Sequence, residues 1–178
     1  FGAVSIDNQL VVETEEDIFE MHNGCICCNV RGDLIRVVDK LMRRRDKFDH
    51  LLIETTGLAD PAPVIQTFFM DDEVRKKARI DAVVTVVDAH HIWQHWEADE
   101  VVEQIAFADV ILLNKTDLVT ESELEELEQR VRGMNALAKI HRTHDAHIGM
   151  DALLGLEAFD VNNVLQLNPE WLNGVAPI

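Results

Sequence analysis

The three cysteines of this 178-residue chain lie within four positions of one another, as Cys25, Cys27 and Cys28. In an extended segment Cys25 and Cys27 point to the same face, and Cys28 joins them if the chain bends. Three thiolates suit Zn²⁺ or Cu(I) and suit Mg²⁺ poorly. A closed structural zinc site needs four protein ligands, so three indicate an open or exchangeable position, with His22, water or a partner protein as the fourth ligand. The alternative is three buried cysteines that act as small hydrophobic residues.

A second group with distinctive chemistry is Asn114-Lys115-Thr116-Asp117, which follows an apolar run at residues 110–113. The Asp117 carboxylate can accept two parallel hydrogen bonds, from N1–H and from the exocyclic amine of guanine. Adenine lacks this donor pair, and a wrong base would leave buried groups unpaired. The stem of Lys115 can lie over the purine, and Asn114 can tie neighbouring loops together. The pattern predicts a guanine site, and the alternative is an ordinary polar turn between a strand and a helix.

A third group, Glu54-Thr-Thr-Gly57, follows another apolar run at residues 51–53. An acidic residue at the end of a strand can hold a Mg²⁺-bound water. Gly57 would let the backbone approach a terminal phosphate and donate its N–H. A contact that exists only while that phosphate is present acts as a switch. The alternative is a Thr-Gly turn that caps the helix expected from Pro61.

The histidines carry a weaker signal. His91 and His95 are one helical turn apart, a spacing that can chelate a metal, but an ordinary helix face is the favoured interpretation. The same holds for the later group of His141, His144 and His147. The sequence has no Ser-His-Asp order and no G-x-S-x-G elbow, which argues against nucleophilic hydrolysis.

Short apolar runs alternate with longer amphipathic segments along the chain. We expect strands at residues 51–53, 82–87, 110–113 and 138–141. We expect helices at residues 30–48, 61–78, 90–107 and 121–134, the last with a capping box that Thr120 and Glu123 form. This alternation predicts an α/β fold with a mostly parallel sheet and helices on both faces. Ligands bind at the carboxyl ends of the strands in such sheets. Three segments stand there, namely 54–57, 88–89 and 114–117, and the first and last are chemically distinctive.

Composition excludes several classes of protein. The formal net charge of −17, from 16 Lys and Arg against 33 Asp and Glu, disfavours a nucleic-acid partner. An acidic protein can still bind phosphates through backbone N–H groups and Mg²⁺. No apolar run reaches the roughly 18 residues of a membrane-spanning helix, and no secretory signal is recognisable. The odd, clustered cysteine count argues against a disulfide framework. We therefore expect a cytoplasmic domain with reduced thiols and no membrane partner.

Together these residues resemble the CobW-like GTPases, relatives of the metallochaperone GTPases UreG and HypB. The resemblance runs through residues 1–7, 23–28, 54–61, 86–89 and 114–117, and it fades after about residue 159. The pairing of Gly-Cys-x-Cys-Cys with Glu-Thr-Thr-Gly is specific to that family. The resemblance implies a P-loop NTPase-type fold that binds GTP and Mg²⁺ and slowly hydrolyses GTP. It also implies that the cysteines hold Zn²⁺, or Co²⁺ or Ni²⁺, for delivery to a client metalloprotein.

The resemblance also implies roles for individual residues. Asn114 and Asp117 would select guanine while Lys115 packs on the base, and Glu54 and Gly57 would serve Mg²⁺ and the γ-phosphate during hydrolysis by water. Asn29 and Gly32, which directly follow the cysteines, would lie near the nucleotide. Metal loading would then respond to the γ-phosphate, a reciprocal coupling between two sites.

Two features depart from the family pattern. The G-x-x-x-x-G-K-[ST] loop, which relatives carry upstream of the segment that matches Phe1, does not occur in this sequence. Ala3 stands where many relatives have an acidic residue that is linked to metal binding. We expect residues 1–160 to be a CobW-like GTPase domain without its N-terminal strand and P-loop, and residues 161–178 to be an exit strand or linker towards a C-terminal domain.

Two rival functions remain open at this point. One is a metal-storage or metal-sensing module whose nucleotide site is vestigial. The other is a structural zinc domain, which would unfold when its metal is chelated. The sequence does not identify the physiological metal, the client or the oligomeric state. A homo-oligomer is one of the states left open.

Overall fold

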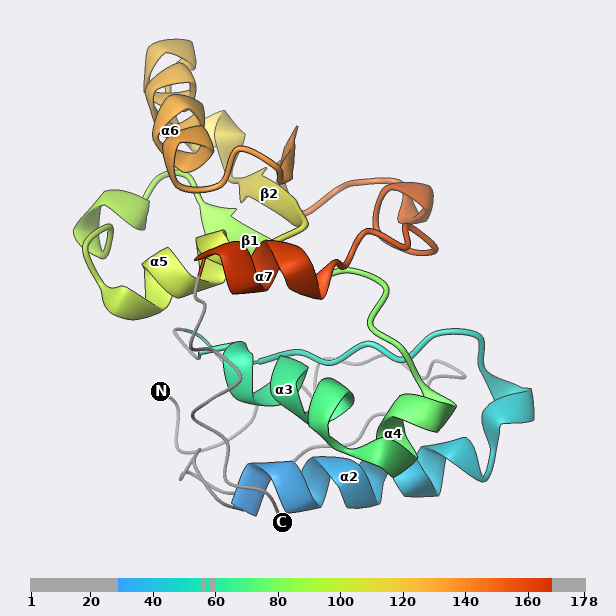
Figure 1. Cartoon of the computed structure of the whole chain (residues 1–178). Coiled ribbons are helices and arrows are strands. Elements are labelled where there is room, and N and C mark those ends of the chain that lie inside the picture. Colours follow the sequence, from blue (N-terminus) through green and yellow to red (C-terminus); the bar gives the residue numbers. More distant parts are fainter. Residues whose placement is uncertain (1–28, 56, 58–59, 168–178) are drawn as a thin grey trace.

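A parallel sheet forms the centre of the part of the chain that a computed structural model describes, namely residues 29–55, 57 and 60–167. Its strands are β1 (Val84–Asp88), β2 (Val110–Asn114) and β3 (Lys139–Arg142), in the order β1-β2-β3. Parallel neighbours need crossover connections, and α5 (Asp99–Ala106) and α6 (Glu121–Met134) supply them. The predicted parallel α/β architecture is confirmed (Figure 1).

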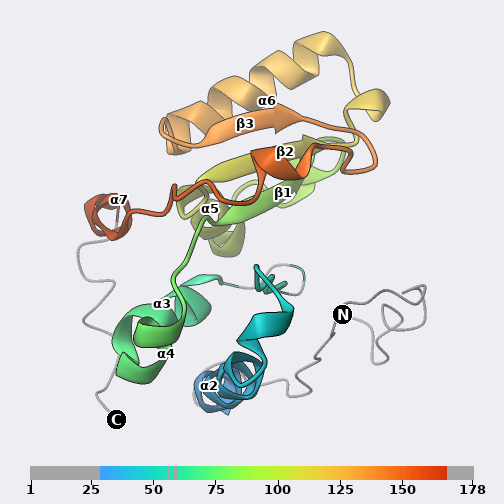
Figure 2. The ribbon, with the colours of Figure 1, turned by 90° about the vertical axis from the view of Figure 1, so that its right-hand side faces the viewer.

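One face of the sheet packs against α5 and α6 (Figure 2). Val87 of β1 and Ile111 and Leu113 of β2 form a core with buried residues of both helices. The central strand β2 is buried from Val110 to Leu113, as its continuous apolar run predicts. The edge strand β1 alternates, and on its other face Val86 is 58% exposed.

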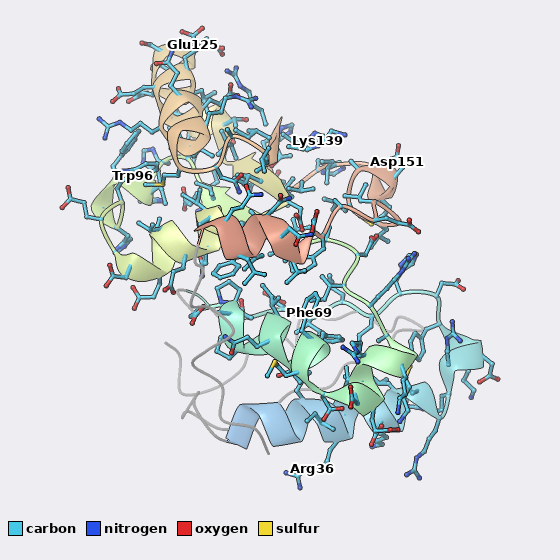
Figure 3. The ribbon with its side chains drawn as sticks, in the orientation of Figure 1. Arg36, Phe69, Trp96, Glu125, Lys139 and Asp151 are labelled. Carbon is cyan, nitrogen blue, oxygen red and sulfur yellow. The ribbon has the colours of Figure 1, made fainter. Side chains whose placement is uncertain are left out.

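Helix α6 begins and ends where the sequence predicts. Thr120 caps it: the backbone N–H of Glu123 donates to Thr120 Oγ1 at 3.4 Å, and the backbone N–H of Thr120 donates to Glu123 Oε2 at 2.7 Å. This reciprocal pair is the predicted capping box. The outer face of α6 is acidic, and Glu125 points away from the sheet (Figure 3).

A second group of helices comprises α2 (Asn29–Met42), α3 (Ala62–Met70) and α4 (Asp72–Lys77). They pack together through Leu34 and Val38 of α2, Phe68 of α3 and Val74 of α4. The last helix, α7 (Val161–Leu167), joins the two groups, because Val164 packs with Ala62 and Ile65 of α3 and with Phe107. Beside this junction the rings of Phe69 and Phe159 lie 5.4 Å apart between centroids.

Three predicted helices have different limits in the structure. The segment 61–78 is divided at Asp71, whose side chain accepts hydrogen bonds from the N–H groups of Glu73 and Val74 at 3.0 and 2.9 Å and so starts α4 as a new helix. The segment 30–48 ends as α2 at Met42, and a 3₁₀ turn, η1 (Arg45–Lys47), follows it. The segment 90–107 becomes another such turn, η2 (Ile92–Gln94), and then α5.

Two further expectations are wrong in this structure. Residues 51–53 form no strand, because they pair with no other described strand; Leu51 and Ile53 instead pack against the core of α2, α3 and α4, while Leu52 is 86% exposed. Residues 161–167 form the helix α7 rather than an exit strand, and its buried Val164 packs against α3. No helix within the described ranges is both long and apolar enough to cross a membrane.

Candidate functional site

Polar residues gather where the three strands end. The strands are parallel and in register, with Asp88 opposite Asn114 and Leu113 opposite Arg142. The segments that leave the strands therefore start at one edge of the sheet, where open parallel sheets bind their ligands. The sequence placed the segments at Asp88 and Asn114 at this edge, and the structure adds the segment after β3.

Asn114 joins the segments after β2 and β3. Its Oδ1 accepts hydrogen bonds from Thr143 Oγ1 at 3.2 Å and from the backbone N–H of Ala146 at 2.9 Å. Thr116 adds two more, because its backbone N–H and its Oγ1 both donate to the Thr143 carbonyl, at 3.2 and 3.0 Å. The prediction that Asn114 ties neighbouring loops together is confirmed.

These two loops hold unusual backbone conformations. Lys115 has a φ of 62°, Asp145 of 49° and Ala146 of 51°. Only one other non-glycine residue in the described part of the chain, Glu157, has a positive φ. Such conformations cost about 1–3 kcal/mol each and persist where the surroundings hold them, most often at functional sites. Their concentration here marks the ends of β2 and β3 as the functional edge.

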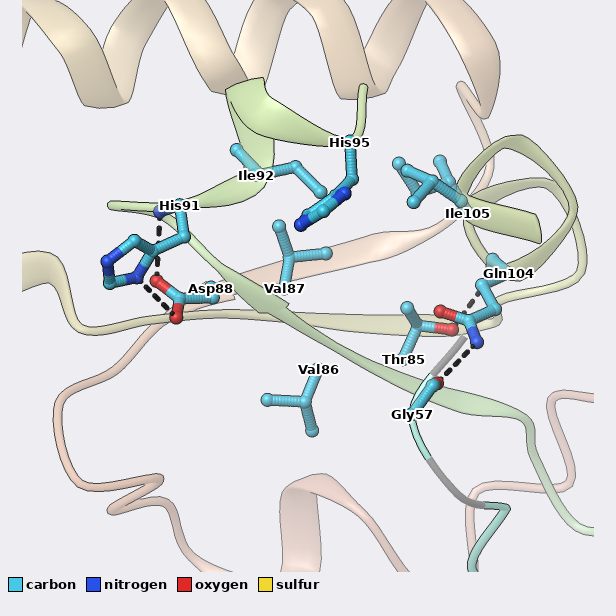
Figure 4. Close-up of a pocket in the computed structure, with 11 residues that line it drawn as sticks. Gly57, Thr85, Val86, Val87, Asp88, His91, Ile92, His95, Gln104 and Ile105 are labelled. Carbon is cyan, nitrogen blue, oxygen red and sulfur yellow. Dashed lines mark hydrogen bonds and ion pairs between the residues drawn. The ribbon is translucent and has the colours of Figure 1, made fainter. Parts of the chain in front are cut away.

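Lys115 reaches across to the neighbouring strand. Its Nζ lies 2.7 Å from Asp88 Oδ2, and His91 Nδ1 lies 3.0 Å from the same oxygen. Burial raises the pKa of Asp88, but the hydrogen bonds from Lys115, from the His91 ring and from the backbone N–H groups of His91 and His90 outweigh it. The net pKa of Asp88 lies well below its usual range, so this carboxylate stays ionised and accepts hydrogen bonds from both side chains. Figure 4 shows its bonds with His91.

Asp117 is exposed in a one-turn helix, η3 (Thr116–Leu118), which follows β2 directly. Its carboxylate makes no hydrogen bond or ion pair with any other residue that the structure describes. Both oxygens are therefore available to accept hydrogen bonds from a ligand, as two parallel donors on a purine require. Two contacts fix this turn: Lys115 pairs with Asp88 at the end of β1, and Thr116 donates to the Thr143 carbonyl after β3.

Gly57 lies near the start of β1, beside Thr85 and Gln104, at the opposite end of a pocket from Asp88 (Figure 4). Its carbonyl accepts a hydrogen bond from Gln104 Nε2 at 3.0 Å, and its φ of 54° is a conformation that glycine adopts without strain. Gly57, Asp88 and His91 line one pocket of about 320 Å³, which runs along β1 (Figure 4). Glu54 lies in the exposed extended segment that leads to Gly57 and makes no ion pair with a described residue.

The remaining predicted site residues either lie outside the described residues or stand away from this edge. The three cysteines and His22 lie outside the described residues. Gly32 lies in α2, in the helical group on the far side from the Asn114 loop (Figures 1 and 2). Asn29 is the first residue of that helix. His95 lines the pocket beside His91, but within the described ranges no three His, Cys, Asp or Glu side chains are grouped so as to hold a metal ion.

Residues 1–142 match the nucleotide-binding domain of the CobW/HypB/UreG family. The chain belongs to this family. It is 37% identical over 162 residues to the zinc-regulated GTPase metalloprotein activator 1 of Schizosaccharomyces pombe, across 89% of this chain and 39% of that protein. It is 34% identical over 177 residues to the zinc chaperone YjiA of Escherichia coli, across 96% of this chain and 55% of that protein.

The fold agrees with this assignment. The crystal structure of the Zn(II)-bound YjiA GTPase from E. coli superposes with a TM-score of 0.62 at 34% identity, over 71% of this chain and 40% of that one. The chain therefore has the P-loop NTPase fold of that neighbour. A Zn(II)-bound triple mutant of YjiA, in which one glutamate and two cysteines are alanine, matches equally well. This CobW-family chain spans between 39% and 55% of the length of the two curated relatives above.

Sequence reasoning missed two residues of this edge, Thr143 and Ala146, and it gave Asp88, at the end of the strand expected at 82–87, no specific role. A signal existed for Thr143, because it follows the strand expected at 138–141, where the carboxyl-end rule applies as it does to Asn114. Ala146 carried no such signal. It contributes a backbone N–H, and its side-chain type does not reveal that role.

Proposed function

We propose that this chain is the nucleotide-binding part of a GTP-dependent zinc chaperone, which hydrolyses GTP slowly and transfers Zn²⁺ to a client metalloprotein. Relatives in the CobW/HypB/UreG family are named zinc chaperones and zinc-regulated GTPases. The observation that carries the nucleotide assignment is the loop at the end of β2. There Asn114 fixes two loops together and leaves the carboxylate of Asp117 exposed beside them.

Guanine recognition follows from these positions. Asp117 accepts hydrogen bonds from the N1–H and the 2-amino group of guanine, and adenine has no equivalent pair of donors. Lys115 supplies an aliphatic stem for the face of the purine, and its ammonium pairs with Asp88. The loop at Asp145 and Ala146 is held against Asn114 and closes the site from the side of β3.

Glu54 and Gly57 serve the phosphate end of the nucleotide. The exposed carboxylate of Glu54 has the oxygen chemistry that Mg²⁺ prefers, through a bound water. Mg²⁺, when bound with GTP, neutralises charge that develops on the phosphates. Gly57 contacts the γ-phosphate through its backbone N–H, which a hydrolysed nucleotide no longer engages. The family resemblance also assigns Asn29 and Gly32 to this end, although both lie in α2, away from the Asn114 loop.

Zn²⁺ is the cargo in this proposal, and Cys25, Cys27 and Cys28 hold it. Three thiolates match Zn²⁺ in softness and leave one position of a tetrahedral ion for an incoming ligand. Co²⁺ and Ni²⁺ are the other candidates for the same thiolates. A carrier site must give up its metal, so an open position fits transfer to a client better than a closed four-ligand site does.

Base selectivity tests the nucleotide assignment. In Asp117→Asn an amide donor replaces one carboxylate oxygen, and the remaining pattern of one donor and one acceptor matches xanthine, which carries a carbonyl where guanine carries the amine. We expect titration with fluorescent GDP and XDP to show GDP affinity falling at least tenfold and XDP affinity rising. The exposed Asp151→Asn serves as the matched control and leaves both affinities unchanged. Equal binding of GDP and ADP by the unaltered chain would overturn the assignment.

Nucleotide control of zinc tests the carrier function. Zinc affinity is measured by competition with a chromogenic chelator, on the reduced protein with Mg²⁺ and either a non-hydrolysable GTP analogue or GDP. We expect the two affinities to differ about tenfold or more, which corresponds to about 1.4 kcal/mol. Equal affinities would instead indicate a storage or sensing module. The control is a variant in which all three cysteines are replaced with serine. Zinc is still bound in the crystal of the YjiA triple mutant, so bound zinc alone does not identify a carrier site, and the zinc affinities of the two proteins are compared instead.

A further inference from the structure

Asp88 uses its two carboxylate oxygens for different purposes. Oδ1 accepts the backbone N–H groups of His90 and His91, both at 3.1 Å, and so closes the turn that leaves β1. Oδ2 faces outward from that turn and accepts Lys115 Nζ at 2.7 Å and His91 Nδ1 at 3.0 Å. One oxygen therefore shapes the local loop, and the other fixes a side chain that comes from the neighbouring strand.

The register of the sheet explains why Lys115 reaches Asp88. Asp88 pairs with Asn114 across the two parallel strands, and Lys115 is the next residue after Asn114. Its left-handed backbone turns the chain at this point, and its side chain returns towards β1. A lysine side chain carries about 2 kcal/mol of rotamer entropy, which a ligand that stacks on it must otherwise overcome.

We propose that Asp88 is a positioning residue for nucleotide binding: it anchors the ammonium of Lys115 so that the aliphatic stem forms an ordered platform for the purine before the nucleotide arrives. The inference rests on the proposed guanine-nucleotide function of this edge. It assigns to the end of β1 a part in base binding that the motif at the end of β2 does not itself contain.

Stability alone does not account for this ion pair. The two side chains are 44% and 34% exposed, and pairs of this kind typically add between about 0 and 1 kcal/mol to folding. The carboxylate of Asp88 nevertheless stays ionised at neutral pH, because burial raises its pKa less than the hydrogen bonds from Lys115 and His91 lower it. A charged anchor of small stabilising effect is what pre-organisation of a binding side chain requires.

The variant Asp88→Asn separates the two functions of the carboxylate. The amide oxygen still accepts the N–H groups of His90 and His91, so the turn after β1 is kept. The amide NH₂ takes the place of Oδ2 and faces two donors, Lys115 Nζ and His91 Nδ1, so the anchor is lost. Asp72→Asn is the matched control: it removes the same charge from an exposed side chain whose one partner among the described residues is Arg75 in α4, at 3.0 Å.

The first measurement needs no nucleotide. In the unaltered chain we expect the two Hε protons of Lys115 to give separate NMR signals, because the end of the side chain is held in one position. They should merge in Asp88→Asn and stay separate in Asp72→Asn. Separate signals in Asp88→Asn, or merged signals in the unaltered chain, would overturn the proposal.

The second measurement is affinity for fluorescent GDP. We expect Asp88→Asn to bind about three- to tenfold more weakly than Asp72→Asn, with Asp88→Glu regaining part of the loss. In a Lys115→Met background, which keeps a long apolar stem, Asp88→Asn should have no further effect. An equal loss in that background would show that Asp88 acts through the fold and not through Lys115, and would overturn the proposal. If the unaltered chain binds no GDP, the proposed function fails, while the NMR signals still decide whether Asp88 orders Lys115.

Discussion

Asn114 Oδ1 accepts a hydrogen bond from the backbone N–H of Ala146 at 2.9 Å, although the two residues are 32 positions apart in the sequence. This bond holds the loop after β3 against the loop after β2. It also holds Ala146, and Asp145 before it, in left-handed conformations that neither residue favours. Asn114 therefore pre-forms the site, and it need not touch the nucleotide to affect its binding.

Replacement of Asn114 by alanine should destabilise the protein by about 1–3 kcal/mol, because Thr143 Oγ1 and the Ala146 N–H lose their shared acceptor. The measurement is urea unfolding followed by far-UV circular dichroism. Asn114→Asp keeps an acceptor oxygen for both donors and should lose less. An unchanged midpoint for Asn114→Ala would show that the two loops are held together by the Thr116 bonds alone.

Asn135 lies at the opposite end of the sheet and holds the segments that lead into β2 and β3. Its buried Nδ2 donates to the carbonyls of Ile105 at 2.9 Å and Ala108 at 2.8 Å, and its Oδ1 accepts the N–H groups of Leu137 at 3.1 Å and Ala138 at 3.0 Å. One side chain thus joins the end of α5, the end of α6 and the approach to β3. Such a fully paired buried amide leaves several backbone groups unsatisfied when it is removed.

We therefore expect Asn135→Ala to lower the free energy of unfolding by about 3 kcal/mol or more. Asn162→Ala is the control, because Asn162 is exposed and its side chain bonds only to Asp160; it should change stability by less than about 0.5 kcal/mol. Parallel urea titrations of the two variants check the difference. Similar small losses for both would mean that water or neighbouring groups replace the bonds of Asn135.

The parts of this fold that could be predicted from the sequence depend on local signals. The run before Asn114 is continuously apolar because β2 is buried on both faces, and α6 has a capping box within four residues. The interruption at Asp71 was also local, since aspartate is a strong N-cap, but the apolar periodicity on either side hid it.

What could not be predicted depends on contacts between distant residues. The bonds of Asn135 and the ion pair between Asp88 and Lys115 join residues about 30 positions apart, and no composition or periodicity encodes them. Residues 51–53 have the apolar character of a strand, but a strand also needs a hydrogen-bonded neighbour. The burial of the helix 161–167 comes from Val164, with Val161 and Leu165 beside it, against residues of α3 and Phe107 that are distant in the sequence.

Asp109 makes the stability depend on pH. Burial raises its pKa above the ordinary 3.8; the backbone N–H of Val83, at 2.8 Å from Oδ2, opposes this, and the charges of Asp160 and Asp81 add to it. A carboxyl whose pKa is raised by folding stabilises the folded state below its ordinary pKa, and this stability is lost as the pH rises through the folded value.

Asp109→Asn should therefore be more stable than the unaltered chain at pH 7, with a difference that shrinks as the pH falls towards 4. The amide oxygen can still accept the Val83 N–H, so the contact at the start of β2 is kept. Urea midpoints at pH 4.5, 5.5 and 7 give the trend, and the exposed Asp151→Asn should show none. A difference that is constant with pH would contradict the raised pKa.

Removal of zinc should leave the core of the chain folded. The three hydrophobic clusters of the described residues join the sheet to α2 through α7 by contacts among residues 34–165. A structural zinc site contributes roughly 10–16 kcal/mol to folding, so that chelation would unfold the protein outright. A bound cargo ion stabilises only by mass action, by about 2.7 kcal/mol when its concentration is a hundred times the Kd.

We therefore expect protein treated with EDTA to keep its far-UV circular dichroism and a cooperative thermal transition, at a lower midpoint that depends on the zinc concentration before treatment. The variant with Cys25, Cys27 and Cys28 replaced by serine should melt at the midpoint of the EDTA-treated protein and should not respond to added zinc. Loss of the cooperative transition on chelation would identify the cysteines as a structural site, and the carrier role would then have to be abandoned, because a metal that holds the fold together cannot be given up to a client.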